Sequence, residues 1–166
     1  MRGKLSYTHA MHALTICAVG SPQEPWQKEA LQTYLLRLRP FAKVECFEIP
    51  DERESPTVPT ARLQAREAEG LRRRLPKRGT VVALDEGGTQ LSSAEWAVFL
   101  RQATEQGQPL AFILGGANGL DPEVRRAADR VFALGRQTLP HILARIVLLE
   151  QLYRAETILQ GKAYHR

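Results

Sequence analysis

Five short apolar runs, each separated from the next by a segment with helical features, constrain the fold of this chain most strongly. The runs are rich in branched and aromatic residues, as β-strands are, and they cover residues 14–19, 44–49, 80–84, 109–114 and 131–134. They are apolar on both faces, which is typical of strands covered by helices on both sides. The alternation therefore predicts an α/β fold with a mostly parallel sheet flanked by helices.

The segments between these runs carry sequence signals for helices. Ser92 followed by Glu95 forms a capping box, and Asp121 before Pro122 is a typical N-cap with proline at the first helical position. A final helix is predicted to run from about Pro140 to Ile158. The glycine-bearing stretch "DEGGTQL" after the third strand is instead expected to form a turn.

The length and composition fit one folded domain. The chain has 166 residues, of which 43% are hydrophobic and 25% are charged, so it is predicted to be globular. No apolar run approaches the roughly 20 residues needed to cross a bilayer. We expect residues 1–12 to be a flexible N-terminal extension and residues 13–166 to form a single cytoplasmic domain. The four histidines are scattered and no zinc-like spacing is present, so no metal is predicted.

The net charge of +5 is unevenly distributed along the chain. Residues 53–78 carry eight arginines and lysines against three glutamates, and Arg72, Arg73 and Arg74 stand in a row. Such a cluster is typical of a surface that binds a polyanion, and nucleic acid is one candidate. A solvated helix face has the same composition, so charge alone leaves both interpretations open.

Three glycines follow the fourth predicted strand, in "LGGANGL". Neither the spacing of a phosphate-binding P-loop nor that of the dinucleotide fingerprint is present. A plain structural turn is one interpretation of these glycines, and a close approach of the backbone to a ligand is the other. Ligands of parallel sheets lie beyond the carboxyl ends of the strands, where residues 84–88, 115–119 and 134–139 would meet. Main-chain groups and leucines at such an edge suit a nucleoside ligand without a triphosphate.

The last predicted helix is apolar almost all round, whereas a surface helix needs only one apolar stripe. The pattern fits a central core helix. It fits equally well a helix that buries one face against the sheet and another against a second copy of the protein.

Several motifs occur together in the second half of the chain. They are "LGGANGL", "TLPHILARIVLLEQLYRA" and the terminal "GKAYHR", preceded by "AVG" and "LDEGG" in the same order. In this combination they resemble the bacterial ribosomal large-subunit methyltransferases that modify N3 of a pseudouridine, within the SPOUT class of knotted methyltransferases. The resemblance covers about residues 14–166. It implies a C-terminal trefoil knot, a homodimer and 23S rRNA as the substrate, either by itself or in the assembled ribosome.

The resemblance also implies functional residues. An S-adenosylmethionine pocket would be formed by Leu84, Gly115, Leu134, Gly135, Arg136, Gln137, Thr138 and Leu139. The tail residues Tyr164, His165 and Arg166 would take part in catalysis, with the identity of the proton acceptor left open. From the arginine cluster itself we expect RNA contacts at Arg72, Arg73 and Arg74, and we expect a further contact at Arg154. Without the resemblance, the tail would be interpreted as a frayed terminus. His141, at the start of the last predicted helix, could contact the cofactor or RNA, and the interpretation that we favour is a structural histidine.

Two alternatives to this function remain at the level of sequence. One is an RNA-binding protein without catalytic activity, which would not bind S-adenosylmethionine. The other is a related methyltransferase that acts on a different RNA nucleotide. The sequence also departs from the family pattern, because Ser21-Pro22 follows the early "VG", where a lysine is common.

Overall fold

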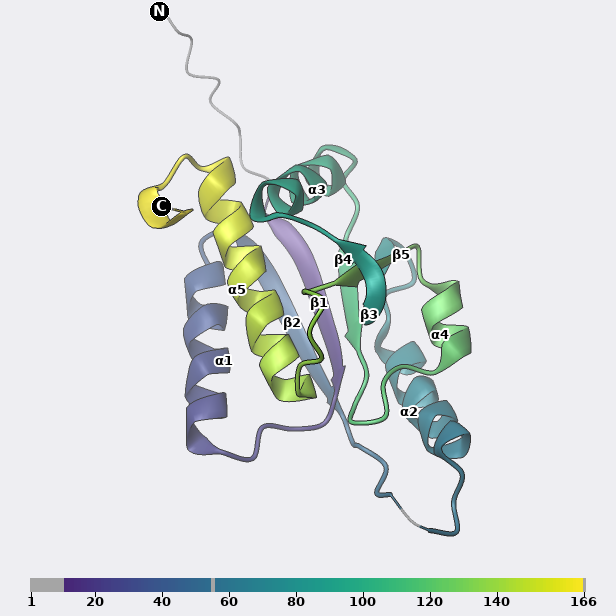
Figure 1. Ribbon diagram of the computed structural model, residues 1–166. Coiled ribbons are helices and arrows are strands. Elements are labelled where there is room, and N and C mark those ends of the chain that lie inside the picture. Colours follow the sequence, from purple (N-terminus) through teal and green to yellow (C-terminus); the bar gives the residue numbers. More distant parts are fainter. Residues whose placement is uncertain (1–10, 55, 166) are drawn as a thin grey trace, which may run out of the picture.

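The computed structural model describes residues 11–54 and 56–165 of the chain. Strands and helices alternate along it (Figure 1). The strands are β1 (His12–Val19), β2 (Ala42–Ile49), β3 (Thr80–Gln90), β4 (Leu110–Leu114) and β5 (Arg130–Ala133). The helices are α1 (Pro25–Leu38), α2 (Thr60–Arg74), α3 (Ser93–Glu105), α4 (Pro122–Ala127) and α5 (His141–Leu159), followed by the short 3-10 helix η1 (Ala163–His165).

All five strands form one parallel sheet in the order β2-β1-β4-β3-β5. The predicted α/β class with a parallel sheet is therefore confirmed. The register places the carboxyl ends of β4, β3 and β5 next to one another, because Leu84 pairs with both Leu114 and Phe132. These three strand ends build one edge of the sheet, which is the edge where ligands of parallel sheets bind.

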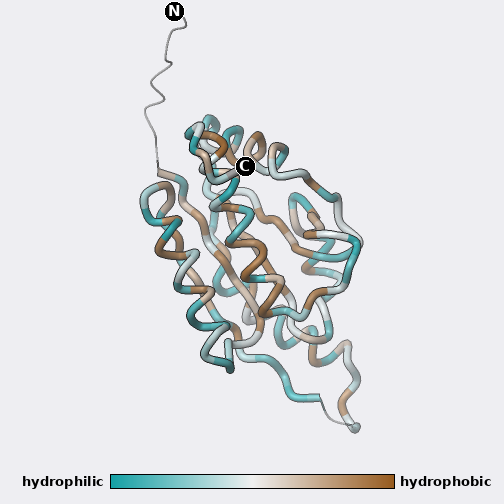
Figure 2. The backbone as a smooth tube through the Cα atoms, turned by 60° about the vertical axis from the view of Figure 1, so that its left-hand side comes forward, coloured by the Kyte–Doolittle hydropathy of each residue, from teal (hydrophilic) through white to brown (hydrophobic). Residues whose placement is uncertain are grey.

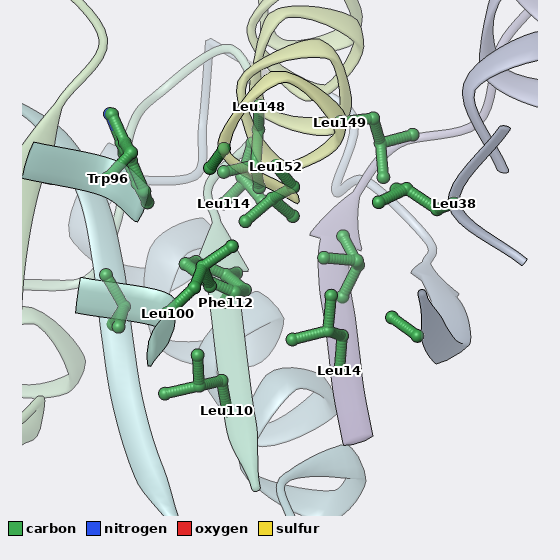
Figure 3. Close-up of a cluster of buried hydrophobic side chains, with 14 of the residues drawn as sticks. Leu14, Leu38, Trp96, Leu100, Leu110, Phe112, Leu114, Leu148, Leu149 and Leu152 are labelled. Atoms are coloured by element: carbon green, nitrogen blue, oxygen red, sulfur yellow. The ribbon is translucent and has the colours of Figure 1, made fainter. Parts of the chain in front are cut away.

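Two layers of helices cover the sheet, and each has its own apolar core. Helices α1, α3 and α5 pack on one face, where Trp96, Phe112 and Leu149 are almost completely buried (Figures 1 and 3). Helices α2 and α4 pack on the other face around a smaller cluster that includes Leu71 and Val124. Because helices cover both faces of the sheet, the strands are apolar on both faces.

The predicted helix starts are confirmed in atomic detail. The Ser92 hydroxyl accepts a hydrogen bond from the Glu95 amide at 3.3 Å, and the Ser92 amide donates to the Glu95 carboxylate at 2.6 Å. The Asp121 carboxylate accepts from the amides of Glu123 and Val124 at the start of α4. Both caps satisfy backbone donors that have no partner within the helix.

The predicted turn at residues 85–91 is wrong, because β3 continues to Gln90. Leu84 and Thr89 both pair with Phe132 of β5, so residues 85–88 bulge out of an otherwise continuous strand. A Cβ atom on Gly88 would lie 2.6 Å from the carbonyl carbon of Phe132. The glycine is therefore required by the close approach of two strands, a situation that has the same local sequence pattern as a turn.

The start of the domain also differs from the prediction. His12, which we assigned to the flexible extension, is the first residue of β1 and is buried. It pairs with Ala42 in the sheet, and its imidazole Nδ1 lies 3.3 Å from the carboxylate of Glu156 on α5. Tertiary contacts that the local sequence does not reveal therefore extend the strand. Of the remaining predicted extension, residues 1–10 lie outside the described residues, and Met11 is exposed and precedes β1.

Helix α5 lies across the centre of its face of the sheet, and hydrophobic residues concentrate along its middle (Figure 2). Leu148, Leu149 and Leu152 are fully buried against the sheet. Leu143 and Val147 stay partly exposed on another side of the same helix. Strand order and packing do not test the knot that the resemblance implies, so the knot stays a prediction.

Candidate functional site

A cavity of about 440 Å³ opens at the carboxyl ends of β4, β3 and β5. Three segments wall it: the bulge of β3, the glycine loop after β4 and the loop that leads from β5 into α5. Its size lies within the range of roughly 300–1,000 Å³ that is usual for small-molecule sites. The lining residues are Leu84, Asp85, Glu86, the stretch 114–120, Leu134, Gly135, Gln137, Thr138, Leu139, His141 and Ala144.

Glycines in this wall serve two different purposes. A Cβ atom on Gly115 would lie 2.6 Å from the carbonyl oxygen of Gly119, so the loop folds back on itself too closely for any side chain. Gly119 adopts a φ of +75°, which side-chain-bearing residues rarely adopt. A Cβ atom on Gly135 would meet nothing within 4 Å. Gly115 therefore shapes the wall, whereas Gly135 leaves space beside the cavity.

The bulge of β3 contributes an acidic wall that is held in place by hydrogen bonds. The Thr138 hydroxyl donates to the Glu86 carboxylate at 2.8 Å, which links the bulge to the loop before α5. Asp85 accepts from the Gly87 amide at 2.9 Å and forms an ion pair with the Arg125 guanidinium at 3.1 Å. These bonds fix the position of two carboxylates at the cavity before any ligand binds.

Helix α2 supports the glycine loop from behind. The Gln64 side-chain amide donates to the Asn118 carbonyl at 2.6 Å. The Glu67 carboxylate, which is buried, accepts from the Glu52 amide at 3.0 Å and lies beneath Gly116. Burial raises the pKa of the Glu67 carboxyl. The loop is thus held between the cavity on one side and the arginine-rich helix on the other.

The cavity combines apolar and polar groups in a way that fits a nucleoside. Leu84, Leu114, Leu134 and Leu139 can cover the faces of a base, while main-chain groups of the three loops can read its edge. Seven of the eight residues assigned by resemblance to S-adenosylmethionine line the cavity. Arg136 lies in the same loop but is exposed and does not line it.

Asp85 and Glu86 line the cavity, as the predicted meeting of residues 84–88 with the other two loops implies, although no role was predicted for either carboxylate. Sequence reasoning missed Leu120 and Ala144, which also line the cavity. His141 lines the cavity and also packs against Gly20, where a Cβ atom would lie 2.6 Å from the imidazole Nε2. The histidine therefore has a packing role and faces the site at the same time.

The tail folds back along its own helix and not toward this cavity. The Tyr164 hydroxyl donates to the Glu150 carboxylate at 3.2 Å, and its ring meets Tyr153 edge-on at 4.7 Å between centroids. Burial, followed by the hydrogen bond to Tyr34, raises the pKa of Tyr164 to about 12. His165 ends η1, and Arg166 lies outside the described residues. Tyr164 does not line the cavity of its own chain.

Glu150 organises the side chains around Tyr164. The Arg154 Nε donates to one Glu150 oxygen at 3.0 Å, and the Gln151 amide donates to the other at 2.7 Å. The Arg154 guanidinium also lies over the Tyr164 ring, 4.9 Å from its centroid. Arg154 is thus engaged by its own chain, on the α5 face of the sheet.

The three arginines at the end of α2 lie on the opposite face and are exposed. Arg72 lies 3.7 Å from Glu123, Arg73 lies 3.4 Å from Glu69, and the Arg74 guanidinium stacks over Phe47. The structure thus brings Arg72, Arg73 and Arg74 together and separates them from Arg154. The four predicted RNA contacts do not form one surface.

A family model described as "Predicted SPOUT methyltransferase" matches residues 12–165, which is nearly the whole chain. The chain belongs to the SPOUT methyltransferase family. Among its relatives, the ribosomal RNA large subunit methyltransferase H of Acidiphilium cryptum is 43% identical and that of Geobacter sulfurreducens is 40% identical. Each match covers 92% of this chain, together with 93% and 98% of the respective relative.

Solved structures agree with the fold. A putative methylase family protein from Neisseria gonorrhoeae superposes with a TM-score of 0.55 at 13% identity, over 92% of this chain and 86% of that one. A probable methyltransferase from Bordetella pertussis gives the same TM-score at 16% identity, over 87% of this chain and 96% of that one. At this level of identity the similarity concerns the architecture alone.

In the part of the chain that the structure describes, no helix is long and apolar enough to span a membrane. In the same part, no three His, Cys, Asp or Glu side chains are grouped so that they could hold a metal ion.

Proposed function

We propose that this protein is an S-adenosylmethionine-dependent methyltransferase of the large ribosomal subunit that methylates N3 of a pseudouridine in 23S rRNA. The observation that carries the proposal is the cavity, which gathers most of the predicted cofactor residues at one edge of the sheet in a chain of the SPOUT family. The names of the relatives, which are ribosomal RNA large subunit methyltransferases, support the substrate.

The cofactor would be held by the three loops of the cavity. Leucines would enclose the adenine, the main chain of residues 134–139 would bond its edge, and the space beside Gly135 would admit the ligand. When bound, S-adenosylmethionine supplies a methyl group on a positively charged sulfur, from which it can be transferred in line to a nucleophile. Alignment with the acceptor is the main requirement for such a transfer.

The residues of this chain would then act on the acceptor. An imide nitrogen carries a proton that must leave, and cations stabilise the resulting anion. The raised pKa of Tyr164 argues against this phenol as the proton acceptor and favours it as the anchor of the tail. We therefore assign proton acceptance to His165, whose side chain type titrates near neutrality, and charge stabilisation to Arg166.

The tail would act on the cavity of a partner subunit in a homodimer. Glu150, which accepts the hydrogen bond from Tyr164, lies six residues beyond the cavity-lining Ala144 and so about 9 Å farther along α5. Tyr164 is therefore held away from the cavity of its own chain. The exposed side chains of Trp26 and Leu36 on α1 offer apolar surface for a second copy. The proposed partners are thus a second subunit, and 23S rRNA or the assembled ribosome in the cytoplasm.

Subunit mixing tests this arrangement. Subunits lacking residues 164–166 and subunits with Gly135→Trp in the cavity should each be inactive as homodimers. Mixed together, they should regain activity, because one site of the heterodimer then has an intact cavity and an intact tail from different chains. Failure to regain activity, with heterodimers demonstrated by differential tagging, would exclude a shared site.

Mass spectrometry of 23S rRNA from cells with and without the protein tests the proposed function. Loss of one methyl group on a pseudouridine in its absence is expected. Loss of a methyl group from another nucleotide would assign a different target. No loss, combined with no calorimetric signal for S-adenosylmethionine, would identify a non-catalytic RNA-binding protein.

A further inference from the structure

The helices on the two faces of the sheet differ in charge. Helices α2 and α4 together carry seven arginines and three glutamates, a net charge of +4. Helices α1, α3 and α5 together carry five basic and five acidic side chains, so they are neutral overall. The positive charge of the helices therefore belongs to one side of the molecule.

The arginines of α2 and α4 form one surface and not two separate clusters. The two helices lie side by side on the same face of the sheet (Figure 1) and share an apolar core that contains Leu71 and Val124. At the surface, Arg72 of α2 lies 3.7 Å from Glu123 of α4. Arg125 and Arg126 follow Glu123 on the same short helix, so the arginines of α4 lie close to the carboxyl end of α2.

This surface reaches the mouth of the cavity through Arg125. The Arg125 Nε lies 3.1 Å from the carboxylate of Asp85, which lines the cavity. The Arg125 side chain is 37% exposed, so its guanidinium stays open to solvent on the side away from Asp85. Arg126, its neighbour, is exposed.

We propose that the α2–α4 surface is the face on which the ribosomal RNA lies, and that Arg125 and Arg126 are RNA contacts in addition to the arginines of α2. This inference rests on the proposed function and deepens it. Guanidinium groups suit phosphates because they bind two oxygens at once and stay charged. Arg125 is the contact nearest to the acceptor nucleotide, since its partner Asp85 belongs to the cavity wall.

The opposite side of the molecule suits protein and not RNA. Trp26 and Leu36 of α1 and Val98 of α3 are exposed there, and Arg154 is engaged by Glu150. Among the described residues, the exposed large apolar side chains that belong to helices all lie on this side. The two surfaces can therefore be occupied at the same time, one by a second subunit and the other by RNA.

Salt-dependent binding to protein-free 23S rRNA tests the inference. Each phosphate contact releases counterions, so Arg126→Glu and Arg125→Gln should each weaken binding and lower the slope of log affinity against log salt concentration by about one. The matched control is Arg101→Glu on α3, which is 44% exposed and paired with Glu105. It should change neither the affinity nor the slope.

The outcomes separate the inference from the function on which it rests. Arg126→Glu leaves the ion pair between Arg125 and Asp85 intact. Calorimetry should therefore show that this variant binds S-adenosylmethionine with unchanged affinity. An affinity and slope equal to those of Arg101→Glu would overturn the inference. Weakened binding to 50S subunits with unchanged binding to protein-free rRNA would also overturn it, because the surface would then contact a ribosomal protein. If the unmodified protein bound neither rRNA nor 50S subunits, the proposed function itself would fail.

Discussion

The two faces of the sheet are built from the same kinds of elements but offer different surfaces. Beneath α1, α3 and α5 lies the larger core, with Trp96 and Phe112 at its centre, and apolar side chains also remain on its outside. Beneath α2 and α4 lies a smaller core, and the outside is rich in arginine. A sheet covered on both sides can thus assign one face to protein contacts and the other to nucleic acid.

The cavity lies where the two faces meet, and each contributes to it. Helix α5 supplies His141 and Ala144, while α2 holds the glycine loop through Gln64. This arrangement allows a small domain to bring a subunit interface, a cofactor and an RNA surface to one edge without an additional RNA-binding domain. The following experiments test that division.

Removal of the tail should have the largest effect. Deletion of residues 164–166 is expected to reduce methylation at least about a hundredfold, because it removes the proton acceptor and a stabilising cation together. Calorimetry should show that the affinity for S-adenosylmethionine changes less than about twofold, since Tyr164, with which the tail begins, does not line the cavity of its own chain. Full activity of the truncated protein would exclude the tail from catalysis.

A charge on the apolar face should break the subunit interface. Leu36→Glu, at a side chain that is 56% exposed in the single chain, is expected to weaken dimerisation at least about tenfold and to reduce activity with it. The matched control is Arg73→Glu on the α2–α4 surface. It should leave the mass measured by light scattering unchanged, and a dimer that persists in Leu36→Glu would show that α1 lies outside the interface.

Replacement by alanine should have different effects on stability at the two kinds of glycine in the cavity wall. Gly115→Ala forces a Cβ atom against Gly119 and is expected to reduce both thermal stability and cofactor affinity, the latter about tenfold. In Gly135→Ala the added Cβ atom has no neighbour within 4 Å. This variant should keep the melting temperature of the unmodified protein while its methyl group narrows the cavity. Scanning calorimetry and titration of the cofactor separate the two effects. An equal loss of stability in both variants would contradict this distinction.

The smallest effect is expected from Tyr164→Phe. Loss of the hydrogen bond to Glu150 should reduce the methylation rate about twofold to tenfold, because the anchor is weakened but its ring remains. The raised pKa of Tyr164 keeps the phenol protonated throughout the neutral range. The pH–rate profile of the variant should therefore keep the apparent pKa of the unmodified enzyme. A shift of that apparent pKa would return Tyr164 to the role of proton acceptor.

Much of the architecture could be predicted because its signals are local. Apolar runs mark the strands, the capping box at Ser92 marks α3, and the shared edge of parallel strands places the loops of the cavity together. The bulge of β3 could not be distinguished from a turn, because a glycine required by a close approach to Phe132 resembles a glycine required by a turn. The support that Gln64 gives to the glycine loop joins residues 54 positions apart and leaves no local pattern.

The roles of the charged residues were harder to predict than the fold. Arg154 is predicted to contact RNA, and Glu150 stands four residues before it, at the spacing of an ion pair along a helix. That signal was available in the sequence. Two other ion pairs depend on how α4 packs, and only the structure reveals them. They join Arg72 to Glu123 and Arg125 to Asp85.

The bulge of β3 fixes the position of the acidic wall through the length of the strand segment. Leu84 and Thr89, on both sides of the bulge, face Phe132, and Gly88 approaches the backbone of Phe132 too closely for a side chain. A residue added to this segment or removed from it would therefore shift Asp85 and Glu86 away from Arg125 and Thr138, and both carboxylates would lose their fixed place at the cavity.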